Sequence, residues 1–330
     1  MNTDESSGVD MPVTDDIIVE PLVHWATLAD FKVEVLGHTK INAKCYKNTR
    51  QQVPIKVTLD ARDENGVQVT LTTAQLQEIT LRYYETDYPM GGWSHTKNEY
   101  EYNFLPARDD GSELQPVDDE DLPGVKANTI TLYMATSMAE KKLAAKIISS
   151  TGAVYSTKDF DSWINVLGVE VPIHPAAAFV LTNNGGPSSD QFDCDVYYLR
   201  FRADYGNGTY SIRGSHHLDV GSGDKHYSWR KDGWREKAQF AYKVGPKSSV
   251  SYGQTGFGSF PINDRAGQAN AARISNKSYQ AKDRDINARV VYYDQYGNPG
   301  MVRYNNSSNG NTMHISDAGD PPRDPEIYGE

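Results

Sequence analysis

Short strand-like runs separated by turn residues constrain this chain more than any other feature. From residue 31 onward, stretches rich in Val, Ile, Thr and Tyr alternate with Gly, Asn, Asp and Pro; examples are KVEVLG, VPIKVTLDA, ITLRYYETD, NEYEYNF and TITLYMAT. Period-two alternation and β-branched runs bounded by such residues are typical of strands. The 21 Tyr against 9 Phe agree, because strand surfaces favour rings with a solvated hydroxyl. The sequence predicts a mostly β protein.

The length predicts two domains. A chain of 330 residues is long for one β-sandwich and suits two domains of about 150 residues each. Pro172 and Pro175 lie where one series of strand-like runs ends and the next begins. We therefore expect two tandem antiparallel β-sandwich domains with few short helices, over 21–171 and 172–316, between disordered acidic tails at 1–20 and 317–330.

Three segments carry helix signals. LTTAQLQEI has Thr72 and Gln75 at capping-box spacing, which predicts one helical turn. Residues 138–148, MAEKKLAAKII, have helix propensity, but the flanking sequence favours a strand that pairs with AVYST across Thr151 and Gly152. Residues 264–273 could hold a short helix.

The clearest predicted hairpin is VPIKVTLDARDENGVQVTL. Its outgoing arm places Ile55, Val57 and Leu59 on one face, residues 63–66 form the turn, and the return arm is Val67, Val69 and Leu71. A similar turn recurs in ARVVYYDQYGNPGMVRY. This pattern of a strand, an Asp-containing turn with Gly and a return strand resembles the sequence pattern of bacterial immunoglobulin-like sandwich modules. The resemblance covers about thirty residues in two places; it implies immunoglobulin-like or jelly-roll-like sandwiches used for adhesion, spacing or display, and carries over no catalytic residue.

The charge and the cysteines limit the possible partners and compartments. The net charge is −11, and residues 1–20 alone contain six acids and no Lys or Arg, so the acidity is concentrated in tails and a loop. That balance argues against nucleic-acid binding. The two cysteines, without a signal peptide or an apolar membrane span, are expected to be reduced. We expect a cytoplasmic protein or one exported by a non-classical route; membrane contact stays open.

Motifs for catalysis and for metal binding are absent from the sequence. It contains no Cys-x-x-Cys, no Gly-x-Ser-x-Gly and no His-Glu-x-x-His. The sequence contains one group of potential metal ligands: His216, His217, Asp219, Asp224 and His226. The two adjacent histidines would point to opposite faces of a strand, so only one of them could join a given site. We therefore predict no catalytic residues, no metal and no cofactor, and a protein that is not an enzyme.

HYSWRKDGWREK, residues 226–237, is the predicted binding site. A turn at 231–233 would place Trp229 and Trp234 on opposing strands, where the two indoles could stack and stabilise the hairpin without any ligand. The same geometry could present a platform for a sugar or a protein. The predicted ligand-binding residues are Tyr227, Trp229, Arg230, Trp234 and Arg235. A weaker patch contains Trp93, Tyr100 and Tyr102.

The sequence leads to three hypotheses of function. The first is a non-enzymatic structural or binding protein that acts in adhesion, display or self-assembly, with a second copy or another protein as partner. The second is a lectin-like protein that binds a glycan at the hairpin. The third is a β-rich toxin or pore component, in which KSSVSYGQTGFGSF would form a membrane-inserting hairpin.

Overall fold

The structure is a computed structural model. It describes residues 22–36, 42–97, 102, 128–186, 188, 192–218, 225–232, 235–252, 257–276, 288–306 and 311–321. For residues 225–239 and a few other strand residues within these ranges, only the backbone is described. The predicted tail at 1–20, residues 322–330 of the predicted tail at 317–330, and most of NEYEYNF lie outside these ranges.

The N-terminal part of the chain forms a sheet of four strands, ordered β1-β3-β6-β5, and a sheet of five strands, ordered β2-β9-β7-β4 with β8 also paired to β7. All neighbours are antiparallel except β2 and β9, which run parallel. The strands are β1 (Thr27–Val35), β2 (Asn42–Tyr46), β3 (Val53–Arg62), β4 (Thr80–Tyr83), β5 (Trp93–Ser94), β6 (Asn128–Met134), β7 (Glu140–Ile148), β8 (Val154–Ser156) and β9 (Ile164–Val169). The helix α1 spans Thr73–Leu76, and a 3₁₀ turn spans Thr157–Phe160.

The first core lies between these two sheets. In β3 the inward positions alternate strictly, and Ile55, Val57 and Leu59 are fully buried, as the sequence predicts. They share one apolar cluster with Leu143 and Val166 of the facing sheet. Burial of an aliphatic side chain stabilises a fold by about 1.5–3 kcal/mol, so this seam holds the sheets together.

The C-terminal part forms a five-stranded sheet, β10-β11-β17-β14-β13, a four-stranded sheet, β12-β18-β19-β20, and the hairpin β15-β16. Its strands are β10 (Phe179–Asn183), β11 (Phe192–Phe201), β12 (Ile212–His217), β13 (Lys225–Asp232), β14 (Arg235–Tyr242), β15 (Ser249–Tyr252), β16 (Phe257–Pro261), β17 (Ala269–Asn276), β18 (Ala288–Asp294), β19 (Pro299–Asn306) and β20 (Met313–Asp317). Two 3₁₀ turns span Ala176–Ala178 and Tyr205–Gly208.

The second core joins the larger two of these sheets. Leu199 and Ala271 of the five-stranded sheet share a cluster with Val290 and the aromatic pair Tyr292 and Tyr304 of the four-stranded one. The two tyrosine hydroxyls hydrogen-bond to each other at 2.7 Å inside this core. A buried polar group costs free energy unless it is paired, and each hydroxyl here satisfies the other.

Several local predictions are confirmed. The capping box at Thr72 and Gln75 forms, and it begins a single helical turn. The segment with helix propensity at 138–148 contains the strand β7, which pairs with β8 across a turn where Gly152 has φ +85°. Tertiary pairing overrides the local propensity there, because alternate positions of β7 fill the first core.

Two local predictions are wrong. Residues 264–273 form no helix; they are a loop followed by β17, which lies between β11 and β14. Tertiary packing overrides the helix propensity of its alanines, because Ala269 and Ala271 are fully buried in the second core and Ala272 in a separate apolar cluster. The return arm Val67–Leu71 forms no strand and is limited to a bridge between Arg62 and Gln68 and backbone hydrogen bonds to Ala61 and Asp63, since β1 and β6 occupy the two edges of β3.

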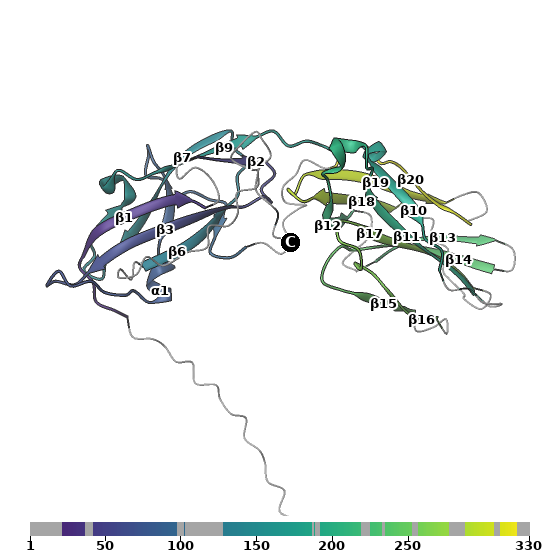
Figure 1. Cartoon of the computed structure of the whole chain (residues 1–330), viewed down its shortest axis with the longest axis horizontal. Helices are drawn as coiled ribbons and strands as arrows, with labels where there is room; N and C mark the ends of the chain where they lie inside the picture. Colours follow the sequence, from purple (N-terminus) through teal and green to yellow (C-terminus); the bar gives the residue numbers. More distant parts are fainter. Residues whose placement is uncertain are drawn as a thin grey trace, which may run out of the picture.

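The predicted mostly β class with antiparallel sheets is confirmed. Figure 1 shows the sheets of β1–β9 and those of β10–β20 as two bodies along the long axis, joined by the segment after β9. The boundary at 171–175 and the division into two sandwich domains stay predictions. The strand β20 reaches Asp317, the first residue of the predicted C-terminal tail.

No helix in the described part of the chain is both long and apolar enough to span a membrane.

Candidate functional site

The predicted binding hairpin exists as β13 and β14. Its strands pair over eight consecutive positions, from Lys225 opposite Tyr242 to Asp232 opposite Arg235. Lys231 and Asp232 belong to the strand, so the predicted turn at 231–233 is wrong at these two residues, and residues 233 and 234 lie outside the described residues. The register places Trp229 opposite Ala238 instead of a second tryptophan.

The role of the hairpin in ligand binding stays a prediction. Trp234 lies outside the described residues, and the structure gives only the strand positions of the other predicted site residues, Tyr227, Trp229, Arg230 and Arg235. Tyr227 is opposite Phe240, and Arg230 is opposite Lys237. β13 ends the five-stranded sheet, so Tyr227, Trp229 and Arg230 lie on an edge strand, whereas Arg235 lies on the neighbouring strand β14.

The weaker aromatic patch does not form a common surface among its described members. The Trp93 indole is half-buried against the first core and donates to the Met90 carbonyl at 2.9 Å. Tyr102 is 6 % exposed and clusters with Val291 and Tyr293 of the C-terminal part. Tyr100 lies outside the described residues.

Metal ligands do not gather in the part of the chain that the structure describes. No group of three or more His, Cys, Asp or Glu side chains has metal-binding geometry there. His216 and His217 are the last two residues of β12, whereas Asp219 and Asp224 lie outside the described residues. The two cysteines, Cys45 and Cys194, are free and buried, and burial raises the pKa of each thiol to about 12.

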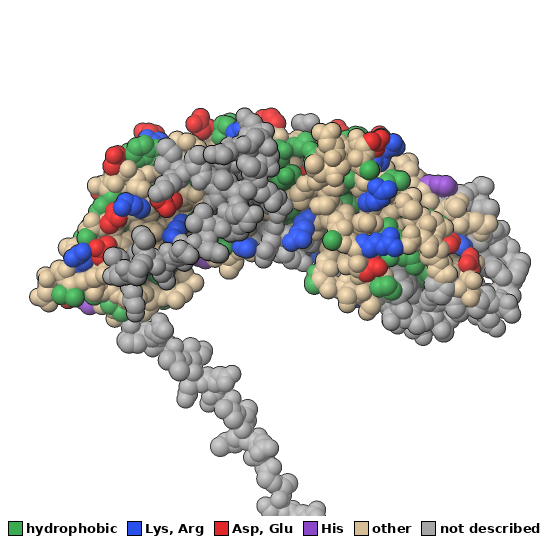
Figure 2. Space-filling view, viewed as in Figure 1, with side chains coloured by type: hydrophobic (Ala, Val, Ile, Leu, Met, Phe, Trp, Pro, Cys, Tyr) green, Lys and Arg blue, Asp and Glu red, His purple; other side chains and the backbone are tan. Residues whose placement is uncertain are grey.

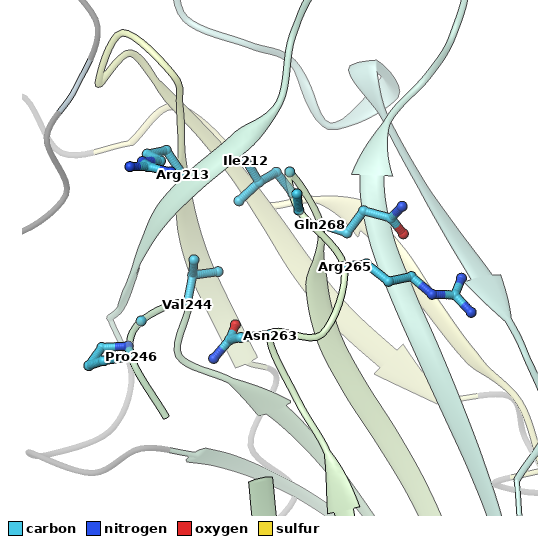
Figure 3. A pocket seen from close by; sticks show the side chains of 10 residues that line it. Ile212, Arg213, Val244, Pro246, Asn263, Arg265 and Gln268 are labelled. Atoms are coloured by element: carbon cyan, nitrogen blue, oxygen red, sulfur yellow. The ribbon is translucent and has the colours of Figure 1, made fainter. Parts of the chain in front are cut away.

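A shallow pocket of about 360 Å³ lies beside the start of β12. Its walls come from β12 and from the loops after β14 and β16, and include Ile212, Val244 and Asn263. Figure 3 shows the side chains of Arg213 and Arg265 at opposite sides, pointing apart. The Arg265 guanidinium lies 3.7 Å from the centre of the Tyr198 ring, outside the pocket. The two arginines therefore do not converge on one ligand.

A network of hydrogen bonds among buried polar groups lies between the two parts of the chain. We call it the junction; it consists of Tyr46, Asn48, Arg50, Tyr102, His174, Tyr293, Asp294, Tyr296, Gly297 and Asn298.

Asn48 is the contact from the N-terminal part. Its side-chain oxygen accepts from the backbone N–H groups of Arg50 (3.0 Å) and Gln51 (2.9 Å), which fixes the loop between β2 and β3. Its amide nitrogen then donates to the Tyr296 carbonyl (2.9 Å) and to Asn298 Oδ1 (3.0 Å). Asn48 thus uses one end to hold its own loop and the other to bind a turn about 250 residues away.

Asp294 is the centre of the network on the C-terminal side. It is fully buried, and its Oδ1 accepts from the N–H groups of Tyr296 and Asn298, each at 2.8 Å. Its Oδ2 accepts from Asn298 Nδ2 at 3.1 Å and lies 2.9 Å from His174 Nε2. The other ring nitrogen of His174 lies 3.1 Å from the Tyr205 hydroxyl. A buried carboxylate requires such partners, because desolvation of an unpaired charge is costly.

His174 brings the connecting segment into the same network. Its N–H donates to the Pro299 carbonyl at 2.9 Å, and the residue forms a parallel bridge with Gly300. The imidazole packs edge-on against Phe201 and Tyr210. The segment between β9 and β10 is therefore fixed to the turn that contacts Asn48.

The two Asp-x-x-Gly turns noted in the sequence have the same hydrogen bonds. Asp63 Oδ1 accepts from Asn65 and Val67 N–H, as Asp294 Oδ1 does from Tyr296 and Asn298. Gly66 and Gly297 occupy equivalent positions with φ of +77° and +79°. A Cβ on Gly66 would meet nothing within 4 Å, whereas one on Gly297 would lie 2.8 Å from Arg50 Cβ. The turn at Gly66 is thus exposed, whereas the turn at Gly297 packs against the N-terminal part of the chain.

Aromatic rings surround these hydrogen bonds. The ring centres of Tyr46 and Tyr296 are 6.0 Å apart. The guanidinium carbon of Arg50 lies 4.4 Å from the centre of the Tyr293 ring. Burial, followed by the charges of the neighbouring tyrosines and Asp294, raises the pKa of Tyr46 to about 12; the Asn298 amide opposes this. The hydroxyl of Tyr46 therefore stays neutral at physiological pH.

The Asp294–His174 pair of the junction is closed off from solvent. The Asp294–His174 pair has the composition of an acid–base dyad, but both side chains are fully buried and have protein partners. A general base must reach the proton it removes, and a buried pair of this kind does not. Of the junction residues, Tyr102 was predicted as part of an aromatic patch, and the polar network itself was not predicted. Its signal was the recurring turn, which located Asp294, but no local pattern indicated Asn48 or His174.

Comparisons with known proteins leave the family open. No protein-family model and no curated protein sequence matches the chain. Among solved structures, the C-terminal domain of the Streptococcus pyogenes antigen I/II-family protein AspA is 11 % identical, with 83 % of this chain and 98 % of that chain covered at a TM-score of 0.23. A structure named BspA_C_mut is 10 % identical, covering 84 % and 97 %, also at 0.23. Likeness at that score supports no conclusion about fold or function.

Proposed function

We propose that the chain is a non-enzymatic structural or binding protein whose two β-sheet parts are held in one arrangement by the junction, as a spacer or display unit requires. The observation that supports this most directly is the buried relay from Asn48 through Asn298 and Asp294 to His174. Interfaces between parts of one chain are usually polar and permit motion. A satisfied buried network restricts that motion, because each displaced group would lose a partner.

The surface is consistent with this role. In Figure 2 the acidic and basic side chains of the described residues are interspersed over the face shown. Adhesion, display and self-assembly remain the finer forms of the proposal. Nothing in the contacts of the described residues specifically favours a glycan site or a membrane-inserting hairpin, and we propose neither.

The test is a distance measurement between spin labels placed at the exposed positions Glu64 and Asn184, one in each part. We expect one narrow distribution for the otherwise unchanged chain. Gly297→Ala should broaden it, because the added Cβ meets Arg50 and pushes the turn away from Asn48.

Gly66→Ala is the matched control. It imposes the same positive-φ cost, about 1–2 kcal/mol, but meets no neighbour, so it should leave the distribution narrow. A broad distribution in the chain without either glycine substitution would refute the fixed arrangement and with it the proposed function.

A further inference from the structure

Edge strands are the places where a β protein can bind another chain through its backbone. An edge exposes a row of N–H and C=O groups, and proteins block it with short strands, bulges or covering side chains. The edges of the described sheets differ in strand length and in the regularity of their register, and one of them is both long and unbroken.

The edge of β1 is blocked twice. Its pairing with β3 shifts between Leu28 and Asp30, and two serines from connections next to the facing sheet accept from backbone N–H groups in the strand or just before it. Ser162 Oγ accepts from the Val33 N–H at 3.0 Å, and Ser150 Oγ accepts from the Trp25 N–H just before the strand at 2.8 Å. β12 also has a register shift, and the remaining edges of the four- and five-stranded sheets are strands of five residues or fewer: β2, β4, β5, β10 and β20.

β13 differs from all of these. It has eight residues, its register with β14 is unbroken, and it contains no proline. It ends the five-stranded sheet, so no other described strand pairs with its outer side. The closing pair of a two-residue hairpin is hydrogen-bonded, so Asp232 and every second residue before it bond to β14. The N–H groups of Lys225, Tyr227, Trp229 and Lys231 therefore point to the outer edge.

We propose that β13 pairs with β13 of a second copy of this chain, antiparallel and centred on Trp229, to form a continuous sheet across a symmetric dimer. Two-fold symmetry permits only registers centred on a residue, because opposite residues in an antiparallel pair lie on the same face of the sheet. The two registers with the longest overlap are centred on Ser228 and on Trp229.

Charge distinguishes between these two registers. The Ser228 register places Lys225 opposite Lys231 in both halves of the dimer, and like charges directly opposite destabilise a sheet. The Trp229 register places Tyr227 opposite Lys231, His226 opposite Asp232 and Trp229 opposite itself. Both registers contain aromatic pairs, since the Ser228 register places Tyr227 opposite Trp229, but only the Trp229 register contains no like-charge pair.

The first test is light scattering with size-exclusion chromatography on the full chain over a wide concentration range. We expect a dimer, and we expect Lys231→Pro to convert it to a monomer, because proline removes an N–H that points to the outer edge. Proline is tolerated at such an edge position, so the far-ultraviolet circular dichroism and the urea midpoint should stay unchanged. A monomer in the unchanged chain, or a persisting dimer in a folded Lys231→Pro chain, would overturn the proposal.

Cross-linking tests the register. In the Trp229 register the two Trp229 Cα atoms are about 5.5 Å apart, within disulfide range, whereas the two Ser228 Cα atoms are more than about 7 Å apart. Under a mild oxidant, Trp229→Cys should give a linked dimer and Ser228→Cys should not. Linking through Ser228→Cys alone would refute this register. The inference rests on the proposed structural function, but a monomeric chain with a narrow spin-label distribution would overturn only the dimer.

Discussion

Asp294 shows how one residue type in one local turn can have two roles. Asp63 and Asp294 make the same bonds within their turns, yet Asp63 is half-buried beside solvent and Asp294 is fully buried. We expect Asp294→Ala to lower the free energy of unfolding by about 3–5 kcal/mol, because His174 and Asn298 lose a buried charged partner. Asp63→Ala should cost about 1 kcal/mol, since water replaces the lost acceptor. Urea unfolding of both variants measures this; equal losses would contradict it.

The buried tyrosine pair predicts a pH dependence at the same scale. Burial raises the pKa of Tyr292 and Tyr304 above the ordinary value of about 10. The folded state thus holds protons that the unfolded state releases, so the stability that this pair contributes is complete below about pH 10 and is lost as the pH rises further. Urea midpoints from pH 8 to pH 11.5 should show this decline. The double variant Tyr292→Phe with Tyr304→Phe should make the decline smaller, because the pair no longer contributes to it, whereas Tyr88→Phe, at a 70 % exposed position, should not.

Individual elements could be predicted where the local pattern and the tertiary environment agree. The alternation in β3 and the capping box at Thr72 are examples, because the buried face and the cap are both encoded within a few residues. The loop and strand at 264–276 could not, since an alanine-rich stretch fits a helix as well as a buried central strand. The return arm after Gly66 failed for a different reason: strands remote in sequence, β1 and β6, compete successfully for the edges of β3.

The protected edge of β1 gives a prediction at the element scale. Ser162 Oγ accepts from the Val33 N–H on the outer side of the strand. We expect Ser162→Ala to lower the free energy of unfolding by about 1 kcal/mol and to speed hydrogen exchange at Val33, because that donor loses its partner. Nuclear magnetic resonance exchange rates provide the measurement, with the exposed Thr70→Ala as control. Unchanged exchange at Val33 would show that the serine does not protect the edge.

At the scale of the whole molecule, the junction predicts energetic coupling between residues far apart in the sequence. Asn48→Ala and Asn298→Ala each remove one end of the same 3.0 Å hydrogen bond. The double variant should therefore lose less stability than the two single losses combined, with a coupling energy of about 0.5–3 kcal/mol. Urea unfolding of the four chains completes the cycle. Additive losses would mean that the two parts unfold without influence on each other through this bond.

The sequence by itself determined the strand-rich class, the position of most strands and the two Asp-x-x-Gly turns, because these depend on periodicity and backbone preferences within about ten residues. It also indicated the hairpin at 226–237, but not its exact turn. Only the tertiary structure decided that Asp294 is buried while Asp63 is not, that Asn48 and His174 complete its network, and that β13 is an open edge. Those properties depend on which distant strands pack together, and no local pattern contains that information.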